Sequence, residues 1–312
     1  MFCSFYFIRP QKINEQFIYT LIFGLFFYHF TIISLRYNIY FMTIKFRNRL
    51  ISLLCILSLV FLLLNSTIFL IKFFTNSLDL SYFQSFYKNS VPFLFRYNIF
   101  YIFAANFLQI FYVALTSFFL YRTFEKTQAK DIIFFYLILI AFLVDTFRIW
   151  IILFNLTGTF TGLLIFCGNA SLFAKLLIPI SFLLTVISRD SSEHHEEEKI
   201  LFIILICAFV LALIIPLNTA KILRTCTVSY AFRKELINYA ILSILLTTIF
   251  LFYDNYKNEY SQLTTVGVVL VAMGIYSTIN CTNLFLFILS FVFLTVGTFL
   301  YLKNLHKQYL WL

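Results

Sequence analysis

The sequence predicts an all-α protein, a polytopic bundle of transmembrane helices. Of its 312 residues, 62% are hydrophobic and only 12% are charged, whereas soluble domains carry roughly 25% charged residues. The stretch Tyr260–Leu302 contains no charged side chain at all. Lys and Arg are concentrated in short segments between apolar runs. Because about 20 apolar helical residues cross a bilayer, we expect nearly all of the chain to be embedded in a membrane.

Eight apolar runs are long enough to be core spans. They cover residues 51–71, 99–121, 132–154, 160–188, 200–219, 236–253, 263–279 and 284–302. The last two lie within the charge-free stretch, which is too long for one crossing and must turn back. The polar cluster between Ser277 and Asn283 marks that turn.

The N-terminal segment admits two interpretations. Residues 17–35 form another apolar run and could be an extra span. Met42, however, precedes a short basic head with Lys45, Arg47 and Arg49, which is how bacterial membrane proteins commonly begin. Residues 1–41 are therefore either a ninth span or an extension upstream of the true start. Residues 42–312 are expected to form one integral-membrane helical domain with no soluble domain.

Charge placement predicts the orientation. If the segment before the first core span is inside, twelve loop Lys and Arg residues lie inside and seven lie outside. Positive loops favour the cytoplasm, so we expect the C-terminus at Leu312 to be cytoplasmic, in a bacterial inner membrane. The net charge of +10 is explained by this anchoring. The expected partners are therefore the lipid bilayer and a membrane protein, not nucleic acid.

The strongest candidate site lies in the third span, where Asp145 and Arg148 interrupt an apolar run. Their spacing places them on one helix face, where they can pair. A charge at this depth costs ~2.5–3.5 kcal/mol on insertion scales, and such residues often serve function. The alternatives are a self-neutralising pair that fixes helix packing and a ligand or proton site.

The fourth span adds Asn169, Ser171 and Lys175. A short turn joins it to the third span, so the two should pack as an antiparallel hairpin. At ~1.5 Å per residue, Asp145 and Asn169 each lie ~15 Å from that turn. We therefore expect a polar pocket formed by Asp145, Arg148, Asn169 and Ser171, with Lys175 deeper.

No cofactor is expected. His194 and His195 lie in an acidic loop and could hold a metal ion, but adjacent residues point in different directions, so a solvated turn is favoured. The cysteines show no C-x-x-C spacing, and no catalytic motif is present.

Three functions remain open. The eight-span pattern resembles the multi-helix membrane modules that begin many bacterial signalling proteins, which implies a sensor or scaffold. Since no kinase or cyclase sequence follows within the chain, it would act through a partner protein. A carrier for small solutes or ions is the alternative, with the polar pocket as its site. A membrane enzyme that modifies lipids or isoprenoids is the second alternative.

Overall fold

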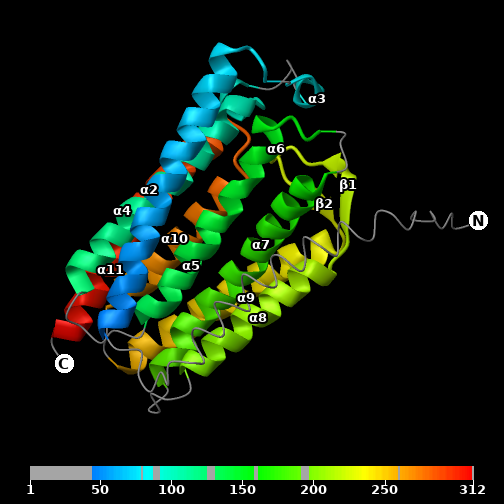
Figure 1. Ribbon diagram of the computed structural model, residues 1–312. Helices are drawn as coiled ribbons and strands as arrows, with labels where there is room; N and C mark the ends of the chain where they lie inside the picture. The colour runs from blue at the N-terminus through cyan, green and yellow to red at the C-terminus, as the bar shows by residue number, and fades with distance from the viewer. Residues whose placement is uncertain are drawn as a thin grey trace, which may run out of the picture.

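A computed structural model describes residues 44–78, 80–86, 92–124, 131–157, 161–190, 197–258 and 261–310. Its main helices are α2 (Ile44–Phe74), α4 (Ile99–Phe124), α5 (Asp131–Asp145), α7 (Gly162–Asp190), α8 (Glu197–Ile214), α9 (Arg233–Lys257), α10 (Leu263–Ile279) and α11 (Leu284–Leu310). Short elements are α3 (Ser81–Gln84), the 3-10 turns η1 (Phe93–Phe95) and η2 (Thr146–Ile149), and α6 (Trp150–Leu153). The helices form one bundle, shown in Figure 1.

Among the described residues, six helical segments are long and apolar enough to cross a membrane. They are 47–74, 99–124, 131–153, 162–186, 233–257 and 284–308. The expected count of eight spans is not confirmed, because the apolar parts of the other two helices are shorter, Ile203–Ile214 in α8 and Leu263–Ile279 in α10. The extra span expected at 17–35, the start at Met42 and the end at Leu312 all lie outside the described residues.

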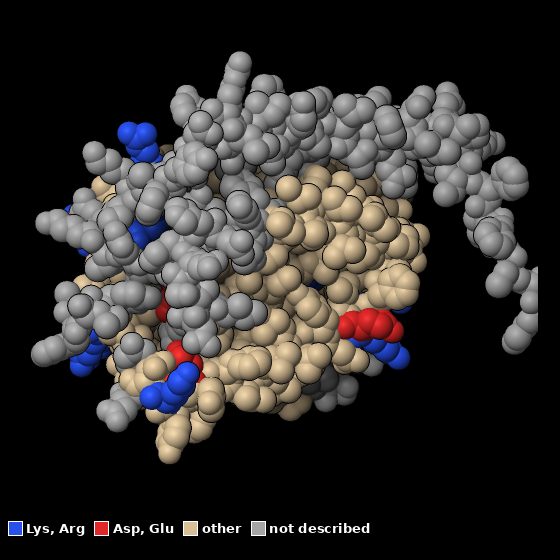
Figure 2. Space-filling view, turned by 90° about the horizontal axis from the view of Figure 1, so that it is seen from below, with Lys and Arg blue, Asp and Glu red and all other residues tan. Residues whose placement is uncertain are grey.

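Burial separates central helices from peripheral ones. The crossing windows that contain α5 and α7 are 78% and 72% buried, whereas those of α2 and α9 are 17% and 22% buried. The peripheral helices expose large apolar side chains such as Leu63, Ile241 and Phe299. On the face seen in Figure 2, the described surface is mostly uncharged. Apolar side chains on an outer surface suit contact with lipid tails.

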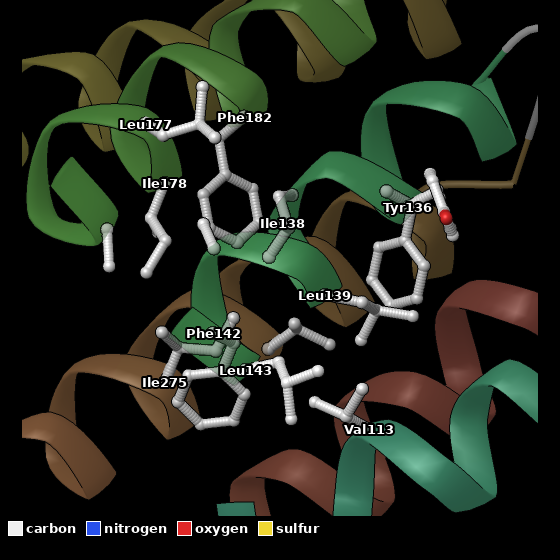
Figure 3. Packing of buried hydrophobic residues seen from close by; sticks show 14 of the residues in the cluster. Val113, Tyr136, Ile138, Leu139, Phe142, Leu143, Leu177, Ile178, Phe182 and Ile275 are labelled. Carbon is white, nitrogen blue, oxygen red and sulfur yellow. The ribbon is translucent and has the colours of Figure 1, made fainter. Parts of the chain in front are cut away.

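The core is formed where α4, α5, α7 and α10 meet. Phe142 and Ile138 of α5 are fully buried and lie near Phe182 of α7 and Ile275 of α10, as Figure 3 shows. Val113 of α4 belongs to the same cluster. Because α5 carries apolar residues around its whole circumference, it is suited to the centre of the bundle.

Glycines bring α10 and α11 into backbone contact. A Cβ atom added at Gly267 would lie 2.6 Å from the backbone nitrogen of Tyr301. One added at Gly297 would lie 2.7 Å from the nitrogen of Val271, and one at Gly274 would lie 2.9 Å from the nitrogen of Leu294. Small residues allow membrane helices to pack this closely, so these three glycines fix the interface.

The described residues are mainly helical, as expected, and one short β-hairpin is added to the helices. We expected the fifth span to reach Thr219, but α8 ends at Ile214, and β1 (Leu217–Ile222) pairs antiparallel with β2 (Val228–Tyr230). Pro216 explains the change, because proline has no N–H for a helix and disfavours helical geometry in the preceding residue. The β-branched residues that follow favour extended structure.

The hairpin covers one end of the bundle beside α7 (Figure 1). The Tyr82 hydroxyl donates to the carbonyl of Ile222 at 3.2 Å, and the Tyr97 hydroxyl donates to the carbonyl of Arg224 at 3.4 Å. Gly168 of α7 leaves room for Leu217 and Val228. A second hydrophobic cluster joins the hairpin to this end of the bundle and includes Phe83, Ile99, Ile149, Leu164, Ile222 and Val228.

We predict that alanine at Gly297 or Gly274 separates α10 from α11 and destabilises the protein. Overpacking of this kind costs about 1–3 kcal/mol. The free energy of unfolding, measured in detergent, should fall by that order for each variant. Val296→Ala is the matched control, because Val296 neighbours Gly297 but is exposed. An equal loss in the control would contradict the close-packing role of the glycines.

We also predict that Cys226, at the hairpin turn, resists alkylation in the folded protein. Burial raises the pKa of its thiol, so the group stays protonated and unreactive near pH 8. Mass spectrometry after maleimide treatment should show no label at Cys226, whereas an introduced Lys221→Cys, at an exposed position on the same hairpin, should be labelled. Rapid labelling of both would show that the hairpin does not dock on the bundle.

Candidate functional site

Asp145 and Arg148 form an ion pair inside the bundle. Nε of Arg148 lies 3.4 Å from Oδ2 of Asp145, and neither residue is exposed. The pairing expected from their spacing is therefore confirmed. A buried ion pair is costly to desolvate unless further hydrogen bonds satisfy both groups, so its other partners decide what the pair can do.

Both carboxylate oxygens of Asp145 are engaged. Ser171 of α7 donates its hydroxyl to Oδ1 at 2.7 Å, and Gln109 of α4 donates its amide to Oδ2 at 3.4 Å. Together with Arg148, these donors offset the loss of water around the carboxylate. Asp145 thus links α4, α5 and α7.

Arg148 is anchored at the C-terminal end of α10. Its Nη1 donates to the carbonyl of Ile279, and its Nη2 donates to the carbonyl of Thr278 at 3.1 Å. Nη2 also lies 3.5 Å from Oε1 of Gln109. The last carbonyls of a helix lack intrahelical donors and carry partial negative charge. A guanidinium suits them because it has several donors and a permanent positive charge.

The pair sits where the third span changes from α-helix to a 3-10 turn. Residues 146–149 form η2, between α5 and α6. Such a change disturbs the regular hydrogen bonds of the helix. Two amides of α4 compensate, because Asn106 donates to the carbonyl of Thr146 at 3.2 Å and Gln109 donates to that of Phe142 at 2.5 Å.

The structure separates the other expected site residues. Asn169 makes no hydrogen bond with Asp145 or Arg148, because it is two positions from Ser171 and points from a different side of α7. Lys175 lies one turn beyond Ser171, within electrostatic range of Asp145. Its ammonium lies over the ring of Tyr230, 5.2 Å from the centroid. The residues expected to form one pocket therefore lie in two neighbouring groups. Asp145, Arg148 and Ser171 form the first group, and Lys175 with Tyr230 forms the second.

Sequence reasoning missed the partners supplied by α4 and α10. Asn106 and Gln109 are polar residues within an apolar run, three positions apart, which is a usable signal for an intramembrane contact. The carbonyls of Thr278 and Ile279 have no signal in the sequence, because any residue supplies a carbonyl. His194 and His195 lie outside the described residues. Among the described residues, no cluster of three metal-binding side chains occurs.

Comparisons with protein-family models, with curated proteins and with solved structures find no match to this chain.

We predict that Asp145 and Arg148 depend on each other energetically. Asp145→Ala or Arg148→Ala alone leaves the other charge unpaired and should lower stability by about 1–3 kcal/mol. Arg148→Ala should cost more, because it also removes the donors that Arg148 gives to the carbonyl of Ile279 and to Oε1 of Gln109. The double substitution should recover part of the summed loss.

Thermal unfolding in detergent of the wild type, both single variants and the double variant gives the coupling energy. Ser171→Ala serves as a reference, because it removes one hydrogen bond to the Asp145 carboxylate, and a bond to a charged group contributes about 1.5–3 kcal/mol. Strictly additive effects of Asp145→Ala and Arg148→Ala would show that the two residues do not stabilise each other.

Proposed function

We propose that the protein is a membrane sensor or scaffold module that acts through a protein partner. The observation that carries this proposal is that the Asp145–Arg148 pair bonds to groups inside the bundle. All of its described partners are helices of the same bundle: α4, α7 and α10. A transported solute or a substrate would need polar groups that are free to bind it, and this pair offers few.

The packing of the core supports the same proposal. A narrow gap between α5, α7, α10 and α11 is lined by Phe135, Ile138, Phe182, Thr185, Val268, Val271 and Tyr301, and it has no room for a water molecule. Carriers place their substrate sites near the middle of the membrane, often at broken helices. A dry apolar gap among the central helices favours a stable module over a conduit.

The proposed membrane topology has eight passes. Contacts between helix ends show that α4 and α11 run in the same direction, because Asn98 bonds to Thr282 at one end and Phe124 meets His306 at the other. The end of α9 contacts the start of α10 through Asn255 and Thr264. α10 packs antiparallel on α11, because Gly267 lies beside Tyr301 and Gly274 lies beside Leu294. α10 therefore returns the chain before α11, and its 17 residues measure ~25 Å.

The partner proposal is tested on native membranes. The tagged full chain, solubilised in mild detergent, should co-purify with one other membrane protein in a constant ratio. An unrelated multi-pass protein with the same tag is the control for non-specific recovery. Recovery of the chain alone, together with solute uptake by proteoliposomes that contain it, would contradict the proposal and favour the carrier.

The proposed eight passes place both ends of residues 42–312 in the cytoplasm. A fluorescent protein fused after Leu312 should fluoresce, and alkaline phosphatase fused at the same point should be inactive. Fusions within the hairpin, at Arg224, should give the opposite pattern. Active phosphatase at Leu312 would show that α8 or α10 does not cross the membrane.

A further inference from the structure

Three consecutive apolar side chains are exposed shortly before α4 begins. Phe93, Leu94 and Phe95 form η1 and are 68%, 46% and 50% exposed. They lie outside the crossing segments, because one such segment ends at Phe74 and the next begins at Ile99. Their exposure is therefore not explained by a membrane-spanning helix. A contiguous apolar patch of this kind indicates an interaction surface.

This patch lies level with the end of the bundle. Immediately before α4, Asn98 donates its backbone N–H to the carbonyl of Thr282 at 3.0 Å. The start of α4 and the turn between α10 and α11 are therefore at one height. Phe95 precedes Ile99 by only four residues. Because a spanning helix begins near the membrane–water boundary, η1 lies at that boundary.

The patch continues the apolar outer surface of two crossing helices. The ring of Phe95 contacts the ring of Phe285 in the first turn of α11, and the ring centroids are 5.1 Å apart. Phe285 is itself exposed, as is Phe100 in the first turn of α4. The same face of α11 continues through the exposed Ile288. Since outer faces of this composition suit lipid tails, η1 extends the lipid-facing surface to the end of the bundle.

Cations lie at the same end. The guanidinium of Arg224, an exposed residue of the hairpin turn, lies 5.5 Å from the ring centroid of Phe86 in the segment that precedes η1. Lys221 of the hairpin is also exposed. Figure 1 shows α3 and the hairpin at one end of the bundle. Apolar side chains flanked by cations suit the boundary between headgroups and acyl chains, where cations meet lipid phosphates.

We propose that η1 is an interfacial anchor whose Phe93, Leu94 and Phe95 insert at the headgroup–acyl boundary of the bilayer that the bundle crosses. Phospholipid fits this patch better than a protein does, because the patch is continuous with the outer faces of α4 and α11 and has cations nearby. The anchor holds the hairpin at the membrane surface, since Tyr82 and Tyr97 bond to hairpin carbonyls. It requires that α4 and α11 cross the membrane, but not that the protein acts through a partner.

The test is tryptophan fluorescence of the full chain in vesicles of phosphatidylcholine and phosphatidylglycerol. Phe93→Trp places an indole in the patch, and the unsubstituted chain gives the background from Trp150 and Trp311. Bromine quenches an indole that it contacts. Lipids brominated near the headgroup end of the acyl chains should therefore quench the Phe93→Trp signal several-fold more than lipids brominated near the methyl end. Iodide in the water should quench it weakly.

Two reference variants calibrate the measurement. Gln84→Trp, at an exposed polar position of α3, should be quenched by iodide and little by brominated lipid. Leu63→Trp, at an exposed position in the central part of α2, should be quenched most by lipids brominated near the methyl end. Because Leu63→Trp reports whether a crossing helix lies in the bilayer, failure of the anchor and failure of the membrane placement are distinguishable.

A further substitution tests whether the apolar side chains hold η1 in the lipid. In the Phe93→Trp chain, adding Phe95→Ser should raise iodide quenching several-fold, because apolar area buried in the boundary is lost. Phe252→Ser is the matched control, since Phe252 is an exposed phenylalanine of α9, and it should leave the quenching of Phe93→Trp unchanged.

Two results would overturn the proposal. Strong iodide quenching of Phe93→Trp without quenching by brominated lipid would show that the patch faces water. Protection of Phe93→Trp from both quenchers would show that protein, such as a second copy of the chain, covers the patch.

Discussion

The fully buried guanidinium of Arg148 is the group on which the arrangement of the central helices depends. It joins the pair in the third span to the last carbonyls of α10 and to Gln109 of α4. Through Asp145, the same network reaches Ser171 of α7. In the membrane interior water is scarce, so each of these groups must find its partner within the protein. The network therefore constrains the relative depth of four helices, whereas apolar packing alone would allow them to slide.

Other parts of the fold are consistent with that constraint. The 3-10 turn places Arg148 beside α10 while Asp145 stays beside α7, and the amides of Asn106 and Gln109 compensate for the disturbed helix. The hairpin then covers this end of the bundle, and its Cys226 lies within electrostatic range of Arg148. Close packing of α10 on α11 through glycines holds the helix end that receives the guanidinium.

The two groups of charged residues have different surroundings. The Asp145–Arg148 pair bonds to three helices of the bundle, which is the pattern of a structural connection and supports a scaffold. Lys175 lies one turn beyond Ser171 on α7. Its ammonium lies over the ring of Tyr230 and has cations in electrostatic range instead of a carboxylate partner.

Composition and periodicity alone determined that the chain forms apolar helices long enough for a membrane. The free-energy cost of burying a charge depends on the residue type and not on which other residues it contacts. The spacing of Asp145 and Arg148 was likewise sufficient to predict their pairing, since both lie within one helix turn. The hairpin at 217–230 was missed, although Pro216 signals the end of a helix. Three features of the site depend on how each helix is rotated and on where the chain folds back. Asp145 bonds to Ser171 of α7, Arg148 bonds to carbonyls of α10, and Lys175 contacts Tyr230. Packing between segments that are distant in the sequence sets the rotation and position of the helices, so only the tertiary structure decided these contacts.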